Sequence, residues 1–184
     1  MNPIEKLIEE HNTILNGISL LESGSDRLEG GEKIPPDFFR KMIDFIRSYA
    51  DKYHHAKEED ILFVKMQAAG FPSGQGPVAV MLAEHDQGRR FIVGLENANE
   101  QYAAGENSFI QDIIENARDY IDLLRQHINK EDNVLYPMAE NVLGESGLAA
   151  MEKEFEGVER EKAGIEEKYL MLLKELESQL NQKN

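Results

Sequence analysis

One pattern occurs twice in this chain: a single histidine, followed roughly forty residues later by a histidine and a glutamate that lie four positions apart. The two copies are His11 with His54 and Glu58, and His85 with His127 and Glu131. Because an α-helix advances about 100° per residue, side chains four positions apart share one face and lie about 6 Å apart along the axis. An imidazole and a carboxylate placed in this way can bind one metal ion, so the repeat predicts a two-metal site between helices.

The ligand types narrow the choice of metal. Each half supplies two imidazoles and one carboxylate, a set that leaves coordination positions open and suits non-haem iron, with zinc as the usual alternative. The chain has no cysteine, so any metal is held by nitrogen and oxygen. A lone histidine on an apolar face is more often an ordinary core residue, but a buried carboxylate costs several kcal/mol unless it is paired or binds a metal. The neighbouring Lys57 and Lys130 lie about 100° further round their helices and are expected to point to solvent.

Apolar residues recur at helical spacing through four long segments, without the sustained alternation that a half-buried strand shows. Helices are predicted over about 3–28, from about 35 to a Gly- and Pro-rich turn at 70–77, after that turn, and from about 108 to an end or kink near Pro137. Four such helices with short connections favour an all-α, up-down-up-down four-helix bundle whose interior holds the candidate ligands.

An additional C-terminal helix is predicted from Ser146 onward, because apolar residues continue there at three- and four-residue spacing among many charges. Its apolar stripe either covers the outer surface of the bundle or pairs with a second copy, as a homo-dimer, or with a protein partner. We therefore divide the chain into a bundle over 1–143 and a helical extension over 144–184.

The charge of the chain excludes one class of partner. The formal net charge is −15, and the lysines and arginines are scattered among acidic residues, so binding to nucleic acid is not expected. The N-terminus lacks a basic leader with an apolar core, and no apolar run reaches about 18 residues, so neither export nor membrane insertion is expected. We expect a cytoplasmic protein.

Two adjacent histidines compete for one ligand position. His54 follows Ile46 and Ala50 on the apolar row of its helix, whereas His55 follows Asp51 on a polar row. His54 is therefore the predicted ligand, and His55 is placed at the surface or behind the ligands.

Other residues near the repeat are weaker candidates. Arg89 stands four positions after His85 and is a candidate partner for a carboxylate behind the ligands, with ordinary solvation as the alternative. Tyr120 is a candidate for the wall of a cavity above the metals, with a core position and a satisfied hydroxyl as the alternative. Asp60 and Asp132 are weak alternative ligands, since each is displaced from the row of the glutamates.

The segments HHAKEEDILF, MLAEHDQGR and HINKEDNVLYP together resemble the hemerythrin-like superfamily, specifically its HHE cation-binding domain proteins, over about 2–143. The resemblance implies two iron ions in the core of a four-helix bundle, joined by two carboxylates and a bridging oxo or hydroxo group. Zinc or a mixed metal centre is the alternative that the ligand set leaves open. The resemblance further implies that Glu58 and Glu131 are the bridging ligands, and that the terminal ligands are His11, His54, His85 and His127.

The chain departs from respiratory hemerythrins on its third helix. Those proteins carry a His-x-x-x-His pair there, but here Met81 and Arg89 occupy the positions four before and four after His85. With one histidine fewer, both irons keep an exchangeable position, which argues against reversible oxygen storage. The pattern resembles HHE proteins that react with oxygen, nitric oxide or peroxide, or that are associated with repair of iron centres under nitrosative stress. Two alternatives stay open: a non-catalytic carrier or sensor of oxygen or nitric oxide, and iron storage or delivery.

Overall fold

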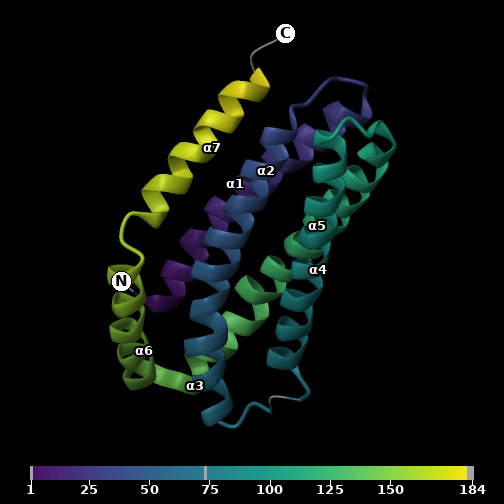
Figure 1. The fold of residues 1–184 in the computed structure, drawn as a ribbon. Coiled ribbons are helices and arrows are strands. Elements are labelled where there is room, and N and C mark those ends of the chain that lie inside the picture. Colours follow the sequence, from purple (N-terminus) through teal and green to yellow (C-terminus); the bar gives the residue numbers. More distant parts are fainter. Residues whose placement is uncertain (1, 73, 182–184) are drawn as a thin grey trace.

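The computed structural model describes residues 2–72 and 74–181, and within these ranges the chain is helical with no strand. Figure 1 shows long helices side by side in a bundle, with a C-terminal arm along one flank. The first and third rods of the bundle are α1 (Pro3–Glu29) and α4 (Pro77–Ala103). The elements after α4 are η3 (Asn107–Phe109), α5 (Ile110–Lys130), η4 (Glu131–Leu135), α6 (Tyr136–Glu161) and α7 (Ile165–Asn181). The second rod of the bundle consists of α2 (Pro36–Phe45), η1 (Ile46–His55), η2 (Glu58–Leu62) and α3 (Phe63–Ala68). The predicted all-α bundle is confirmed.

Local sequence signals account for the ends of the helices. Asn2 caps α1 in a capping box, where its side chain accepts a hydrogen bond from the backbone of Ile4 and Glu5 reaches back to the backbone of Asn2. The turn between α3 and α4 begins and ends with glycines at positive φ, 106° at Gly70 and 80° at Gly76. The turn predicted at 70–77 therefore separates the second and third helices of the bundle.

The bundle helices change to π-helical geometry where the repeat lies. His54 and His55 end the π-helix η1, Glu58 begins η2, and Glu131 begins η4. A π-turn holds one extra residue, and such turns are rare in proteins and frequent at functional sites. The helical period used in the sequence analysis is thus locally disturbed at the candidate ligands.

We expected the fourth helix of the bundle to end or kink near Pro137, but the chain continues past this residue as α6. Pro137 occupies the first turn of α6, directly after the π-turn η4, where a missing N–H is tolerated. The break comes at Gly144, where φ is 58° and ψ is −175°. This glycine marks the point at which the chain leaves the bundle, and the division into 1–143 and 144–184 stays a prediction.

The extension forms two helices instead of the single helix predicted. Residues between α6 and α7 turn at Gly164, whose φ of 83° favours glycine. The apolar stripe of α7 is buried against the bundle through Tyr169, Leu173, Leu176 and Leu180. The first of the two expected uses of the stripe, covering the bundle, is therefore confirmed.

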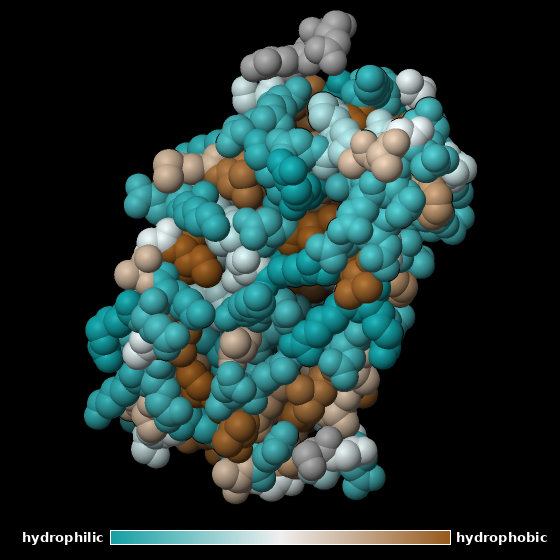
Figure 2. All heavy atoms as spheres, viewed as in Figure 1, coloured by the Kyte–Doolittle hydropathy of each residue, from teal (hydrophilic) through white to brown (hydrophobic). Residues whose placement is uncertain are grey.

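The candidate ligands form a polar layer between two apolar clusters. The larger cluster includes Ile14, Tyr53 and Leu124, and the smaller one includes Leu7 and Leu62. Figure 2 shows that the viewed face is mostly hydrophilic, with apolar residues in separate patches. Among the described helices, none is both long enough and apolar enough to cross a membrane.

Candidate metal centre

The structure brings the six predicted ligands together in the middle of the bundle. Each is at most 2% exposed, and together they come from all four rods of the bundle. The ligand atoms form two groups, and within each group all atoms lie within 4.8 Å of one another. Glu58 belongs to both groups. The first group contains His11, His54, Glu58 and Glu131, and the second contains His55, Glu58, His85 and His127.

In the second group, the Nε2 atoms of His85 and His127 lie 3.0 Å apart. Two nitrogens that bind one ion at right angles, with bonds of about 2.1 Å, are separated by about the same distance. Glu131 Oε1 lies 3.1 Å from His127 Nε2, and Glu58 Oε2 lies 3.5 Å from His85 Nε2. The two imidazole nitrogens and the neighbouring carboxylate oxygens are ligands of the kind that bind one metal ion.

In the first group, Glu131 Oε2 lies 3.3 Å from His11 Nε2, and Glu58 Oε2 lies 3.7 Å from His54 Nε2. Glu131 therefore directs one carboxylate oxygen toward each group. Glu58 Oε2 lies between His54 and His85, which belong to different groups. Each of the two carboxylates therefore lies near a histidine of both groups.

Several of these atoms lack a hydrogen-bond partner among the described residues. They are His54 Nε2, Glu58 Oε2 and both carboxylate oxygens of Glu131. Buried polar atoms are normally satisfied, because an unpaired one costs free energy. A donor set of imidazole nitrogens and carboxylate oxygens that point at one another is satisfied by cations placed between them. The residues present therefore fit a metal centre.

The buried carboxylates of the site also shift the pKa values of Glu58 and His127. Burial and the nearby Glu131 carboxylate raise the pKa of Glu58 well above its usual range. Burial by itself would lower the pKa of His127, but the carboxylates of Glu131 and Glu84 raise it to about 9. Without a metal, this concentration of carboxylates retains protons that a bound cation would displace.

A carboxylate lies behind each of the four predicted histidine ligands, at its Nδ1 atom. The pairs are His11 with Asp132 at 2.7 Å, His54 with Glu10 at 2.9 Å, His85 with Glu59 at 2.7 Å, and His127 with Glu84 at 2.9 Å. With Nδ1–H donating outward, the lone pair of Nε2 faces the centre of the site. Asp132, considered as an alternative ligand, thus supports His11, and Asp60 is exposed.

Basic side chains pair with three of these carboxylates. Lys57 donates to Glu10, Lys130 donates to Glu84, and Arg89 donates to Glu59 at 2.6 Å. The pairing expected for Arg89 is therefore present. Lys130 is partly exposed, as its predicted direction requires.

The prediction that Lys57 points to solvent is wrong. Its ammonium lies 3.9 Å from the centre of the Tyr53 ring and 5.3 Å from that of Phe155, and the residue is fully buried. Phe155 belongs to the part of α6 beyond Gly144, so the C-terminal extension also contacts this lysine.

His55 is also buried, so its alternative placement at the surface is wrong. Its ring stacks on that of His85, with centroids 3.9 Å apart and planes 15° apart. Asp51 lies 3.6 Å from His55 Nδ1 and is itself held by Arg89 through two hydrogen bonds. The helical period correctly predicted that His55 and His54 lie on different faces of their helix. It could not predict that α4 packs over the face that carries His55.

Tyr136 has a place in the site that the sequence analysis did not predict. Its hydroxyl donates to Glu58 Oε1 at 2.8 Å and lies 3.3 Å from His11 Nε2. Tyr136 stands five positions after Glu131, a spacing that shares a face only across the π-turn η4. An α-helical period therefore gave no signal for it.

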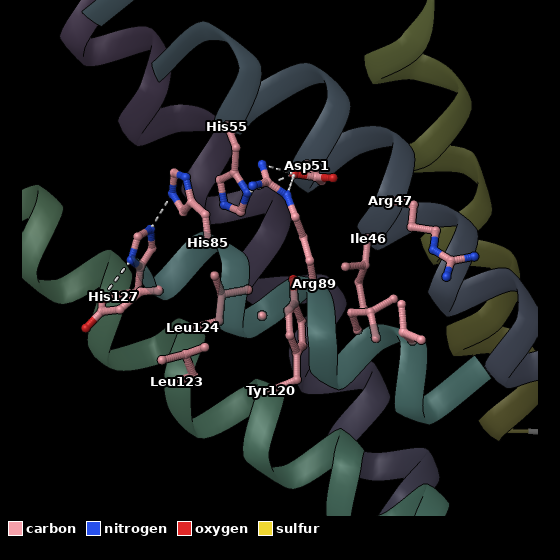
Figure 3. A pocket seen from close by; sticks show the side chains of 14 residues that line it. Ile46, Arg47, Asp51, His55, His85, Arg89, Tyr120, Leu123, Leu124 and His127 are labelled. Carbon is pink, nitrogen blue, oxygen red and sulfur yellow. Dashed lines mark hydrogen bonds and ion pairs between the residues drawn. The ribbon is translucent and has the colours of Figure 1, made fainter. Parts of the chain in front are cut away.

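A cavity of about 110 Å³ reaches the site from one side. Figure 3 shows His55, His85 and His127 at one end of this pocket and Tyr120 below them. Tyr120 lines this pocket, and its buried hydroxyl has no hydrogen-bond partner in the described part of the chain. Its place in the wall of a cavity above the metals stays a prediction.

Comparison with protein families matches residues 2–139 to the hemerythrin HHE cation binding domain. An uncharacterized protein of Mycobacterium tuberculosis is 24% identical over 160 residues, which cover 87% of this chain and 62% of that protein. The iron-sulfur cluster repair protein YtfE of Escherichia coli is 23% identical over 133 residues, which cover 71% of this chain and 60% of YtfE. The chain thus spans about three fifths of the length of these curated relatives. The matched range contains all six candidate ligands.

Proposed function

We propose that this chain, which belongs to the hemerythrin HHE cation-binding family, is a non-haem di-iron protein that binds or reacts with a small molecule such as oxygen, nitric oxide or peroxide. The observation that carries this proposal is the set of buried imidazole nitrogen and carboxylate oxygen atoms that converge from four helices, with those of His54, Glu58 and Glu131 unpaired among the described residues. Imidazole and carboxylate ligands with open positions suit non-haem iron, and zinc is the alternative.

The proposed ligand set follows the geometry of the two groups. His11 and His54 hold the first metal, His85 and His127 hold the second, and Glu58 and Glu131 bridge them. The support is that each bridging carboxylate lies near a histidine of both groups, at 3.1 Å and 3.3 Å for Glu131 and at 3.5 Å and 3.7 Å for Glu58. An oxo or hydroxo bridge between the irons is part of the proposal.

The chain's own residues would prepare the site for this chemistry. When bound, reduced iron supplies electrons and open coordination positions to a small molecule. The carboxylates behind the histidines hold each imidazole in the tautomer that binds metal, and the apolar clusters on both sides exclude water. The similarity to YtfE, which is named for iron-sulfur cluster repair, supports a role in the response to oxidative or nitrosative stress.

Metal analysis of the purified chain, combined with an optical spectrum of the oxidised protein, tests the proposal. We expect about two irons per chain and near-ultraviolet bands of an oxo-bridged pair, because the site offers two positions with shared carboxylates. Zinc in place of iron, or one metal or fewer per chain, would overturn it in favour of a structural or storage role.

Gas exchange separates reaction from carriage. The reduced protein is mixed with oxygen or nitric oxide and then purged with argon. A chemically altered product, such as oxidised iron with reduced oxygen, supports a reactive centre. Full recovery of the gas and of the reduced spectrum would instead identify a carrier or sensor.

A further inference from the structure

The cavity beside the metal centre contacts only one of the two proposed metal positions. Its lining includes His85 and His127 of the second group, whereas His11 and His54 do not line it. The first position is enclosed on its other side by Tyr136, whose hydroxyl lies 3.3 Å from His11 Nε2. A small molecule that enters through the cavity therefore meets the second position first.

His55 lines this cavity next to the second position, in an orientation that does not suit a ligand. The lone pair of an imidazole nitrogen lies in the plane of its ring. Because the rings of His55 and His85 are nearly parallel and 3.9 Å apart, an ion in the plane of His85, at a bond length of about 2.1 Å, lies outside the plane of His55. His55 thus faces the space beside the metal.

Tyr120 places a second polar group in the same space. Its ring fits against Gly88, where an added Cβ would lie 3.4 Å from Tyr120 Cε2. Its hydroxyl is buried and has no hydrogen-bond partner among the described residues. Figure 3 shows the hydroxyl end of the ring directed toward the end of the pocket where His55 and Asp51 lie.

The size and polarity of the rest of the cavity limit which molecules can enter it. Ile92, Leu123 and Leu124 give it apolar walls, and a volume of about 110 Å³ admits a molecule of a few atoms. The charged groups near its mouth are neutralised, since Arg89 donates to Asp51 and Arg47 pairs with Glu96. The pocket therefore suits a small neutral molecule with a hydrogen-bond acceptor.

We propose that this cavity is the ligand pocket of the protein, that it delivers a two-atom gas or a peroxide to the metal held by His85 and His127, and that Tyr120 and His55 orient the bound molecule by hydrogen bonds. This inference rests on the proposed function. Tyr120 and His55 are positioning residues toward the ligand, and neither holds a metal.

The first test uses nitric oxide as the probe on the reduced, iron-loaded full chain. Tyr120→Phe keeps the ring and removes the hydroxyl. We expect the variant to keep two irons per chain. Nitric oxide should dissociate about threefold to tenfold faster, because the variant lacks the free energy of one net hydrogen bond. The N–O stretching frequency should shift and should no longer respond to D₂O. Tyr102→Phe is the matched control, because its hydroxyl donates at 3.0 Å to Ile34 O in another part of the core.

His55→Gln separates a positioning residue from a ligand. We expect the variant to retain two irons and to change the N–O stretching frequency. Loss of one iron would show that His55 is a ligand and would overturn the proposal for this residue. Leu123→Trp fills the cavity without touching the ligands, and it should slow nitric oxide association by about tenfold or more while the iron content is unchanged.

Xenon binding in crystals of the purified protein tests the cavity without iron chemistry. A xenon atom between Tyr120 and Leu124 is expected, and its absence would overturn the pocket. If the wild-type chain takes up no iron, or its iron binds no nitric oxide, the proposed function fails and this inference fails with it. If the wild type binds nitric oxide, but Tyr120→Phe and Leu123→Trp behave as the wild type does, only the pocket inference fails.

Discussion

The ammonium group of Lys57 pairs with the carboxylate of Glu10, and both side chains are buried directly behind His54. Glu10 accepts from His54 Nδ1 and from Lys57 at its two different oxygens. Burial raises the pKa of Glu10 to about 7 even though Lys57 lowers it. The position of a proposed metal ligand thus depends on a buried ion pair that Phe155 of the C-terminal extension covers.

Replacement of Lys57 by methionine should destabilise the protein. The substitution keeps the length of the side chain but leaves the Glu10 carboxylate buried without its cation, which costs on the order of 3–5 kcal/mol in the free energy of unfolding. Urea denaturation of the metal-free chain measures it. Lys52→Met is the control, because Lys52 is exposed on the π-helix η1 that precedes Lys57. Equal unfolding midpoints for the two variants would contradict this account.

Glu131→Gln should reduce metal binding at both positions. Glu131 directs Oε2 toward His11 and Oε1 toward His127, and an amide offers only one neutral oxygen in their place. We expect the iron content to fall from about two per chain to about one or fewer, as measured by mass spectrometry. The exposed Asp60→Asn variant should retain the wild-type content. A Glu131→Gln protein with two firmly bound irons would exclude Glu131 as a bridge.

The carboxylates behind the histidines allow each metal position to be weakened separately. Asp132→Asn should lower affinity at the first position through His11, and Glu84→Gln should lower it at the second through His127. Such outer partners change metal affinity by about 10- to 100-fold. Competition with a chelator resolves the two binding steps. The assignment is contradicted if both variants weaken the same step.

The metal-free protein should lose stability as the pH rises from about 6.5 to 9. The Glu131 and Glu84 carboxylates overcome the effect of burial and raise the folded-state pKa of His127 to about 9, above the unfolded value of about 6.5. Protonated His127 therefore stabilises the fold below pH 6.5, and this contribution, on the order of 3 kcal/mol, is lost as the pH approaches 9. Thermal unfolding at pH 6.5, 7.5 and 9 measures it.

Two comparisons control the pH experiment. The iron-loaded protein should lack this fall, because metal binding takes the place of the proton on His127. Metal-free His127→Gln should show a smaller fall than the wild type. A metal-free His127→Gln protein whose stability falls as much as that of the wild type between pH 6.5 and pH 9 would show that His127 does not cause the fall.

The fold class and the proposed ligands could be predicted because both depend on local periodicity. Apolar residues at helical spacing defined the four helices of the bundle, and His54 with Glu58 and His127 with Glu131 continued those rows. A carboxylate on a buried row needs a partner, so a metal is the simplest explanation for two such rows that also carry histidines.

The amino-acid sequence alone therefore specifies an all-α bundle and the six candidate ligands at its polar centre. What covers each helix is set by packing in three dimensions: α4 buries His55, and α6 beyond Gly144 buries Lys57. Packing also sets which distant residues meet, such as Asp132 with His11, and it brings Tyr136 to Glu58 through a π-turn. The physical reason is that helical periodicity specifies the direction of a side chain around its own axis, whereas burial and pairing depend on the neighbouring helix that packs there.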